Sequence, residues 1–393
     1  MESKLPKFIH FVIDDKFIND SYRCFQNAGL TENIFYYICE KKYTLNYINK
    51  EAISVITQKD AKQILLSLTH NETIVLHSLY SLPAKLSKYI HPQNKVIWYA
   101  WGFDLYSNDY PLKPLIRLAI KKLHPITHQA LNGALFLNNI VKRIKYYLSI
   151  NSQSSKNDYI HLISRVNFFA GVFPCEYDLL REQYSFFTAQ RIKHDYIHPE
   201  EFSEKDINKP QSEAGRNILL GNSASYLCNH LDLLHDLYQK VKSRDFLIYC
   251  PLSYGGNKYY NNKVIREGRK LFGDKFIPLM DFLPFDEYTK IIQSCGNVIL
   301  GYERQAATCN CLTALWNGLK LFVPKSSMNF KEYKEIEGLC IYSIEDDLND
   351  ITLKSHLNYS IVEERKKISK TYSYDRWKLD LMESLKLINQ LEK

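Results

Sequence analysis

Short apolar runs alternate with longer amphipathic stretches through the first half of the chain. Such runs are typical of buried parallel strands, and the longer periodic stretches between them are typical of helices. Strands are therefore expected at 8–13, 35–39, 74–77 and 96–100, and helices at 60–68, 84–89 and, with a break near Pro125, 111–148. Strands separated by helices predict βαβ units with right-handed crossovers.

The same alternation begins again after residue 216. The stretch 198–216 is polar and contains two prolines and one glycine, which indicates a connection between domains. A long amphipathic helical region with Trp377 is expected at 361–391. Between them, strands are expected at 217–220, 246–250, 276–279, 298–301 and 319–323, and helices at 230–242, 260–272, 285–294 and 309–317.

These elements predict an α/β protein with two Rossmann-like domains that face each other across a cleft, followed by a helical tail. The expected boundaries are 1–198 for the first domain, 199–216 for the linker, 217–360 for the second domain and 361–393 for the tail. Glycosyltransferases of the GT-B fold have this architecture, and periplasmic binding proteins and several epimerases share it. The function therefore has to be inferred from the site rather than from the fold.

The composition is that of an ordinary globular protein, since 45% of the 393 residues are hydrophobic and 24% are charged. It excludes a disordered chain, a collagen-like repeat and a coiled-coil rod. No run approaches the ~18–20 apolar residues of a membrane-spanning helix, and residues 1–15 lack the apolar region of a signal peptide. The nine cysteines are scattered without zinc-site spacing, so reduced thiols in a cytoplasmic protein are expected.

The formal charge of +8 is unevenly distributed along the chain. Residues 110–157 contain eight basic side chains and no acidic one, which predicts an anionic partner, either a lipid surface or a polyanion. A solvated helix face is the alternative. No nucleic-acid-binding module accompanies this stretch, so a nucleic acid is not expected as a partner. The eight residues are Lys113, Arg117, Lys121, Lys122, Lys142, Arg143, Lys145 and Lys156.

In the second half, glycine, hydroxyl, amide and arginine residues follow the predicted strands, where parallel sheets bind ligands. A strand that ends before a helix start offers N–H groups and the positive end of the helix dipole to a diphosphate, and Arg304 can bind two phosphate oxygens at once. Helix capping, a surface salt bridge and core packing are the structural alternatives. The predicted donor-binding residues are Gly221, Asn222, Ser223, Ser253, Tyr254, Phe282, Tyr302, Arg304, Gln305 and Thr308.

In the first half, residues 98–106 place an acidic side chain among aromatic ones at a predicted strand end. Aromatic rings with a carboxylate commonly hold a sugar, and burial would raise the pKa of Asp104 toward that of a base. Trp101 and Tyr106 are expected to bind an acceptor. Acidic pairs at 14–15 and 346–347 lack the context of metal ligands, so no metal or other cofactor is expected. The candidate catalytic residues, in order of preference, are Asp104, Asp15, His77 and His10, each with a purely structural role as its alternative.

Several strings, in order over nearly the whole chain, resemble those of one enzyme family. The sequence is similar to the TDP-N-acetylfucosamine:lipid II N-acetylfucosaminyltransferases, glycosyltransferase family 56. It departs from the family pattern at Asp14, at Tyr99 and at Ala306-Ala307, where that family has a small residue, a histidine and a glycine-containing pair. The matching strings are Ile9-His10 with Asp15, His77, Trp101–Tyr106, Ile218–Ser223, Pro251 with Tyr254 and Asn257, Phe285–Tyr288, Arg304-Gln305, Thr308 and Trp377.

The resemblance implies a GT-B glycosyltransferase whose C-terminal half holds a nucleotide-sugar donor, a dTDP-linked, Fuc4NAc-like deoxy-amino sugar. It further implies a polyprenyl-diphosphate-linked saccharide as the acceptor, and work at the cytoplasmic face of the inner membrane in bacterial surface polysaccharide synthesis. Peripheral attachment to anionic lipid would suit the basic stretch.

Loss of a nucleoside diphosphate develops negative charge, which Arg304 and helix N-termini would stabilise. An inverting transfer needs a base from the first half, whereas in a retaining transfer Asp104 would hold sugar hydroxyls. A nucleotide-sugar epimerase and a non-catalytic sugar-nucleotide-binding protein of the same two-domain shape are the alternative functions.

Overall fold

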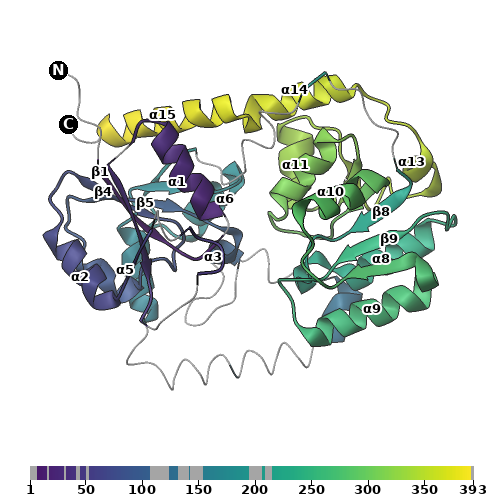
Figure 1. Ribbon diagram of the computed structural model, residues 1–393, viewed down its shortest axis with the longest axis horizontal. Helices are drawn as coiled ribbons and strands as arrows, with labels where there is room; N and C mark the ends of the chain where they lie inside the picture. Colours follow the sequence, from purple (N-terminus) through teal and green to yellow (C-terminus); the bar gives the residue numbers. More distant parts are fainter. Residues whose placement is uncertain are drawn as a thin grey trace. The chain divides into compact units, whose positions relative to one another are not determined.

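The apolar runs of the first half form one parallel sheet, sheet A, in the computed structural model of the protein (Figure 1). Its strand order is β3-β2-β1-β4-β5-β6-β7, and every neighbouring pair is parallel. The strands are β1 (Lys7–Val12), β2 (Asn33–Ile38), β3 (Ser54–Ile56), β4 (Glu72–Leu76), β5 (Lys95–Tyr99), β6 (Phe168–Ala170) and β7 (Gln190–Arg191). The structure describes residues 7–15, 17–30, 32–40, 45–49, 53–106, 124–131, 141, 154–193, 206–208 and 215–390.

The second half forms another parallel sheet, sheet B, with the order β10-β9-β8-β11-β12-β13. In both sheets the first strand of the half lies beside the second and the fourth, which is the Rossmann arrangement. The strands are β8 (Asn217–Leu220), β9 (Ile248–Pro251), β10 (Phe276–Leu279), β11 (Cys295–Ile299), β12 (Lys320–Val323) and β13 (Tyr342–Ser343).

Helices connect the strands of each sheet. In the first half these are α1 (Phe17–Asn27), α2 (Gln58–Ser67), the 3₁₀ helix η1 (Ala84–Tyr89), α3 (Gly102–Tyr106), α5 (Lys156–Ser164) and α6 (Pro174–Gln183). In the second half they are α8 (His230–Lys240), α9 (Lys258–Phe272), α10 (Phe285–Ser294), α11 (Thr308–Trp316), α12 (Met328–Phe330) and α13 (Asp350–Lys354), followed by α14 (Ile361–Tyr372) and α15 (Tyr374–Gln390). Thr57 and Ser155 begin α2 and α5 with reciprocal capping boxes to Asp60 and Asp158.

Eight of the nine predicted strands are confirmed within two residues at either end, and the ninth, β11, begins three residues before the predicted start at 298. The predicted α/β architecture with two parallel sheets is confirmed with them. Four strands have no counterpart in the prediction: β3, β6, β7 and β13. Each has only two or three residues, too few to show a period of two in the sequence.

The chain divides into two compact units. Unit 1 consists of Met1–Arg117, Asn139–Glu200 and Tyr374–Lys393, and unit 2 consists of Leu118–Asn138 and Glu201–Ser373. The tail expected as one segment is therefore divided, because α14 belongs to unit 2 and α15 to unit 1. Residues 125–131, within the predicted helix 111–148, are helical and belong to unit 2.

Helix α15 contributes to the core of unit 1. Trp377, Leu381, Leu385 and Ile388 are spaced by three or four residues, so they lie on one face of the helix, and all four are buried. They pack in one cluster with residues of α1 and sheet A, including Phe25, Val75, Ile97 and Phe168. Figure 1 shows α15 beside α1.

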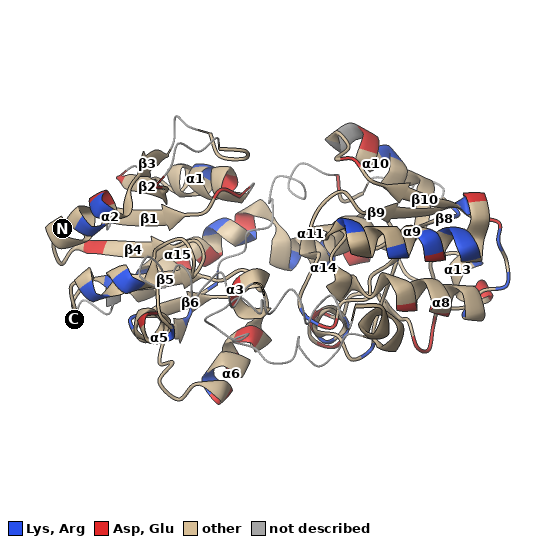
Figure 2. Ribbon diagram, turned by 90° about the horizontal axis from the view of Figure 1, so that it is seen from below, with Lys and Arg blue, Asp and Glu red and all other residues tan. Residues whose placement is uncertain are grey.

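Charged residues lie mainly on helices and loops, with few on the strands (Figure 2). Of the eight basic residues between 110 and 157, only Lys156 is among the described residues, as the first residue of α5. The others lie outside them, so the predicted binding of this basic stretch to an anionic lipid surface stays a prediction. No helix within the described part of the chain is both long enough and apolar enough to cross a membrane.

Replacing Trp377 by alanine is expected to destabilise unit 1, because the indole is 5% exposed within the core cluster. Deleting a buried aromatic side chain costs about 3–5 kcal/mol of unfolding free energy. Leu379→Ala on the same helix is the matched control, since Leu379 is 57% exposed and its loss should stay within about 0.5 kcal/mol. Scanning calorimetry that gave both variants the same melting temperature would contradict this packing.

Candidate functional site

The carboxyl ends of β8 and β11 meet at the point in sheet B where the strand order reverses. Connections leave neighbouring strands toward opposite faces at such a point, which opens a crevice where doubly wound sheets bind ligands. All ten predicted donor-binding residues follow β8, β9, β10 or β11, four strands that are neighbours in the sheet. The fold therefore brings these residues to the carboxyl edge of sheet B.

The loop after β8 begins with a glycine that no other residue replaces without strain. Gly221 has φ +79°, in the left-handed region, and its N–H donates to the carbonyl of Ile299 at 2.9 Å. A Cβ at this position would lie 2.5 Å from Nε2 of His230. His230 is completely buried, which lowers the pKa of its imidazole to about 4. A neutral, buried imidazole therefore packs against the loop at Gly221.

Tyr302 connects the loops that follow β8 and β11. Its hydroxyl donates to Oδ1 of Asn222 at 2.8 Å and lies 3.2 Å from Oγ of Ser223. Both Tyr302 and Ser223 are buried, and burial raises the pKa of Tyr302 well above its usual value. The tyrosine therefore remains a protonated donor that holds the two loops together.

Helix α11 begins at the same edge and lacks a side-chain cap. Its N-cap residue, Ala307, has left-handed φ and ψ of 57° and 30°, a conformation that glycine adopts more readily than alanine does. Asn329, also buried, holds the peptide of Ala306 by accepting from its N–H at 3.3 Å and donating to its carbonyl at 2.8 Å. Gln305 donates to Oγ1 of Thr308 at 2.7 Å. The first-turn N–H groups have no intrahelical acceptors.

Exposed groups surround this helix start. Arg304 is partly exposed, with Nη1 donating to the carbonyl of Gln305 at 2.7 Å and the guanidinium 5.8 Å from the Tyr302 ring. Tyr254, after β9, is 50% exposed, and Phe282, after β10, is 81% exposed. Ser253 is partly exposed beside Tyr254. A cation and two aromatic surfaces thus lie on the edge that carries the uncapped helix.

In sheet A, Asp104 is buried and tied to four donors. Its Oδ1 accepts from the Ser78 hydroxyl at 2.6 Å. Its Oδ2 accepts at 3.1 Å from the N–H groups of Leu79 and Trp101 and from the indole N–H of Trp98. Burial raises the pKa of Asp104 to about 6, and the hydrogen bonds oppose that shift. These contacts favour the structural alternative, in which Asp104 joins the ends of β4 and β5.

His10 and His77 form a fully buried pair in sheet A. Nδ1 of His10 lies 2.8 Å from Nε2 of His77, and Nε2 of His10 lies 3.2 Å from Oδ1 of Asn33. An amide oxygen only accepts, so the proton of a neutral His10 is on Nε2 and His77 donates to Nδ1. Asp15 differs from both histidines because it is partly exposed, and its Oδ1 accepts from the N–H of Phe17 at the start of α1, at 3.2 Å.

Trp101 and Tyr106 also have internal partners. The indole N–H of Trp101 donates to the carbonyl of His77 at 2.8 Å, and the hydroxyl of Tyr106 donates to the buried Glu176 at 2.7 Å. The more exposed ring near them is Phe103, 36% exposed and stacked on Trp101 at 6.1 Å between centroids. Acceptor binding by Trp101 and Tyr106 stays a prediction.

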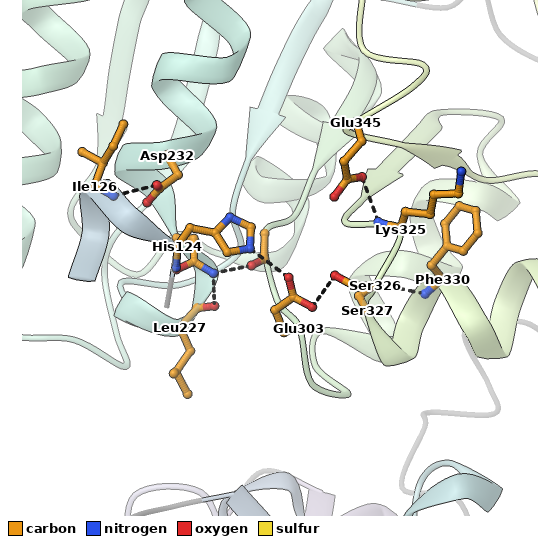
Figure 3. A network of polar contacts seen from close by, with 12 residues as sticks. His124, Ile126, Leu227, Asp232, Glu303, Lys325, Ser326, Ser327, Phe330 and Glu345 are labelled. Atoms are coloured by element: carbon orange, nitrogen blue, oxygen red, sulfur yellow. Dashed lines mark hydrogen bonds and ion pairs between the residues drawn. The ribbon is translucent and has the colours of Figure 1, made fainter. Parts of the chain in front are cut away.

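The sequence analysis did not identify the residues whose side chains hydrogen-bond to the loop that follows β11 in sheet B. Asn229, at the N-cap of α8, is buried with a left-handed φ of 53°, and its Nδ2 donates to the carbonyl of Gly301 at 2.7 Å. His124 lies 2.9 Å from Glu303, which follows Tyr302 (Figure 3). These contacts join positions far apart in the chain, and no local pattern signals them. Within the described residues, no three His, Cys, Asp or Glu side chains are grouped to hold a metal ion.

Solved structures share this fold at low sequence identity. The lipopolysaccharide outer core galactosyltransferase WaaB, in its apo form, has a TM-score of 0.60 and 9% identity over 95% of this chain and 97% of its own. The Anabaena protein HepE in complex with UDP and glucose has a TM-score of 0.60 and 9% identity over 97% and 99%. A glycosyltransferase from Rickettsia africae has a TM-score of 0.59 and 14% identity over 98% and 99%. These similarities show the fold alone.

Comparison of the sequence with family models identifies the family. No sequence among the curated proteins matches the chain. The model of the family described as 4-alpha-L-fucosyltransferase, glycosyl transferase group 56, matches residues 169–383, which is more than half of the chain. The resemblance seen in the sequence strings is thereby confirmed. The chain therefore belongs to glycosyltransferase group 56 and is a glycosyltransferase of the GT-B fold.

Proposed function

We propose that this glycosyltransferase moves a Fuc4NAc-like deoxy-amino sugar from a dTDP-linked donor to a polyprenyl-diphosphate-linked saccharide. The family description, 4-alpha-L-fucosyltransferase, supports a deoxy sugar as the transferred group. The motif resemblance supports the nucleotide and the lipid-linked acceptor. The reaction would take place at the cytoplasmic face of the inner membrane, in bacterial surface polysaccharide synthesis, with the enzyme attached peripherally to anionic lipid.

The observation that carries the proposal is the uncapped start of α11 beside Arg304 at the sheet B edge. First-turn N–H groups and the positive end of a helix dipole favour a diphosphate, and a guanidinium adds a charge-assisted contact. Tyr254 and Phe282 offer exposed rings on neighbouring loops, which suits a base or a sugar face. HepE, of similar fold, was solved with UDP and glucose.

The same groups would stabilise the leaving group. Breaking the bond between the sugar and the nucleoside diphosphate develops negative charge on the diphosphate. Arg304 and the N–H groups of α11 are fixed by the loop contacts before the reaction, so they stabilise this charge without reorganising. This is the interaction that transfer requires and that simple sugar binding does not.

An inverting transfer would also need a base for the acceptor hydroxyl. Among the four candidates, His10, His77 and Asp104 are each 2% exposed or less, whereas Asp15 is partly exposed at the carboxyl end of β1. We therefore assign the base to Asp15 and a positioning role to Asp104. Phe103, stacked on Trp101 and exposed, would offer its ring to the acceptor saccharide.

A panel of nucleotide sugars, each incubated with and without a polyprenyl-diphosphate-linked saccharide, tests the function. Transfer is expected from a dTDP-linked deoxy-amino sugar and only when the lipid-linked acceptor is present. Isomerisation of the donor without acceptor would indicate an epimerase, and binding without turnover would indicate a binding protein. Either result would overturn the proposal.

Arg304→Ala is expected to weaken donor binding or turnover by about tenfold to a hundredfold, because a charge-assisted contact contributes roughly 1.5–3 kcal/mol. The measurement is kcat/KM for the donor. Arg266→Ala is the control, since Arg266 is an exposed cation of α9 in the same unit. Equal kinetics for Arg304→Ala and Arg266→Ala, in folded protein, would remove Arg304 from the site.

Asp15→Asn is expected to lower turnover, whereas Asp104→Asn is expected to leave it nearly unchanged. Asp15→Asn should lower kcat by about 10²-fold because an amide accepts no proton, while its oxygen can still accept from Phe17. In Asp104→Asn the amide oxygen can still accept the three N–H groups at Oδ2, and its NH₂ can donate to Ser78. Near-normal kcat is therefore expected. Loss of kcat in Asp104→Asn alone, at an unchanged melting temperature, would return the role of base to Asp104.

A further inference from the structure

Residues 124–131 precede the second half by almost a hundred positions, yet they are anchored within unit 2. The N–H of His124 donates to Oδ1 of Asn229 at 3.0 Å. The N–H groups of Ile126 and Thr127 donate to the two oxygens of Asp232, each at 2.8 Å. A buried carboxylate thus caps the start of helix 125–131, where the helix dipole favours negative charge.

Asn229, which binds this segment, also binds the loop at the proposed donor site of sheet B. The Oδ1 of Asn229 accepts from the N–H of His124, and its Nδ2 donates to the carbonyl of Gly301, two residues after the end of β11. Asn229 is completely buried, so neither contact competes with water. The position of His124 is therefore coupled to the strand end from which Tyr302, Glu303 and Arg304 follow.

The imidazole of His124 reaches the same loop directly. Its Nε2 lies 2.9 Å from Oε1 of Glu303, and the other carboxylate oxygen accepts from the hydroxyl of Ser326 at 2.7 Å. Figure 3 shows Glu303 between these two partners. The carbonyl of Glu303 accepts from the N–H of Met328 at 3.0 Å. Glu303 is thus held at both its side chain and its backbone.

The charges around His124 favour the imidazolium form. The hydrogen bond that His124 donates to Glu303 raises the pKa of His124 above its ordinary value, and the charges of Glu303, Asp232 and Asp236 add to the increase, while partial burial opposes it. Glu303 is in the loop after β11, next to the cation Arg304, and the two aspartates are on α8. The imidazole is 24% exposed and the Glu303 side chain 10%, so solvent screens the pair only partly.

We infer that His124 is a positioning residue for the nucleotide-sugar donor, acting through its ion pair with Glu303. The inference rests on the proposed donor site at the start of α11. Glu303 is adjacent to Arg304, so an unpaired carboxylate there would repel a diphosphate and compete for the guanidinium. His124 neutralises Glu303 and fixes the direction of the loop that carries Arg304.

The pH dependence follows from the sign of the shift. Since the pKa of His124 is raised in the folded protein, the ion pair is present at acidic and near-neutral pH and is lost as pH rises through that value. Donor affinity should fall over the same range, and the fall should depend on His124. The ionisation of the nucleotide itself is common to all variants and cancels in the comparison.

The test measures binding of dTDP and of UDP by titration calorimetry at pH 6 and pH 8.5, for the wild type, His124→Gln, and His124→Gln combined with Glu303→Gln. At pH 6, His124→Gln should bind about tenfold more weakly, because the variant lacks the positive charge that offsets the Glu303 carboxylate. The difference from the wild type should be smaller at pH 8.5 than at pH 6, because the imidazole loses its charge as pH rises. The double variant should recover most of the lost affinity.

His235→Gln is the matched control, since His235 makes the same kind of pair with Glu267, at 3.0 Å, between α8 and α9. It should bind like the wild type at both pH values. A loss in His124→Gln that is the same at both pH values and is not recovered by Glu303→Gln, or no loss at all, would overturn the inference while leaving the donor site in place. Failure of the wild type to bind either nucleotide would overturn the donor site and the positioning role together.

Discussion

The reversal of strand order between β8 and β11 is the constraint on which the candidate site depends. The chain leaves β8 toward β9 on one side and leaves β11 toward β12 on the other, so their loops diverge and leave room for a ligand between them. The start of α11 lies at this point without a side-chain cap. First-turn N–H groups and the positive end of a helix dipole are suited to an anion, and group 56 glycosyltransferase chemistry releases one when the donor is a nucleoside diphosphate sugar.

Buried polar contacts fix the conformation of these loops. Ala307 keeps a left-handed backbone that costs an alanine about 1–2 kcal/mol relative to the right-handed region, and buried Asn329 holds the neighbouring peptide on both sides. Tyr302 and Asn229 play the same part for the ends of β8 and β11. Buried, satisfied polar groups of this kind specify one loop conformation, which is what a site for a diphosphate needs before the donor arrives.

The sequence predicts the sheets well because a buried parallel strand is a short run of mostly apolar residues. Runs such as 217–220 are apolar on both faces. It also predicts which loops carry the site, since the carboxyl ends of neighbouring strands share an edge. The sequence does not show which of the candidate site residues have their polar atoms bonded to other groups of the protein. Asp104 and Tyr106 have the residue types of an active site, yet their polar atoms are bound within unit 1. The contacts of His124, Asn229 and Asn329 are set by tertiary structure, and their spacing in the chain carries no signal.

The central claim is that the donor nucleotide is held by the carboxyl edge of sheet B. Amide hydrogen exchange of the wild-type protein, with and without saturating dTDP, tests it most directly because exchange reports each backbone N–H. Binding should slow exchange at 221–223 and 307–310 and leave 77–80 and 101–104 in sheet A unchanged. Protection at the sheet A positions, with none at the start of α11, would contradict the account.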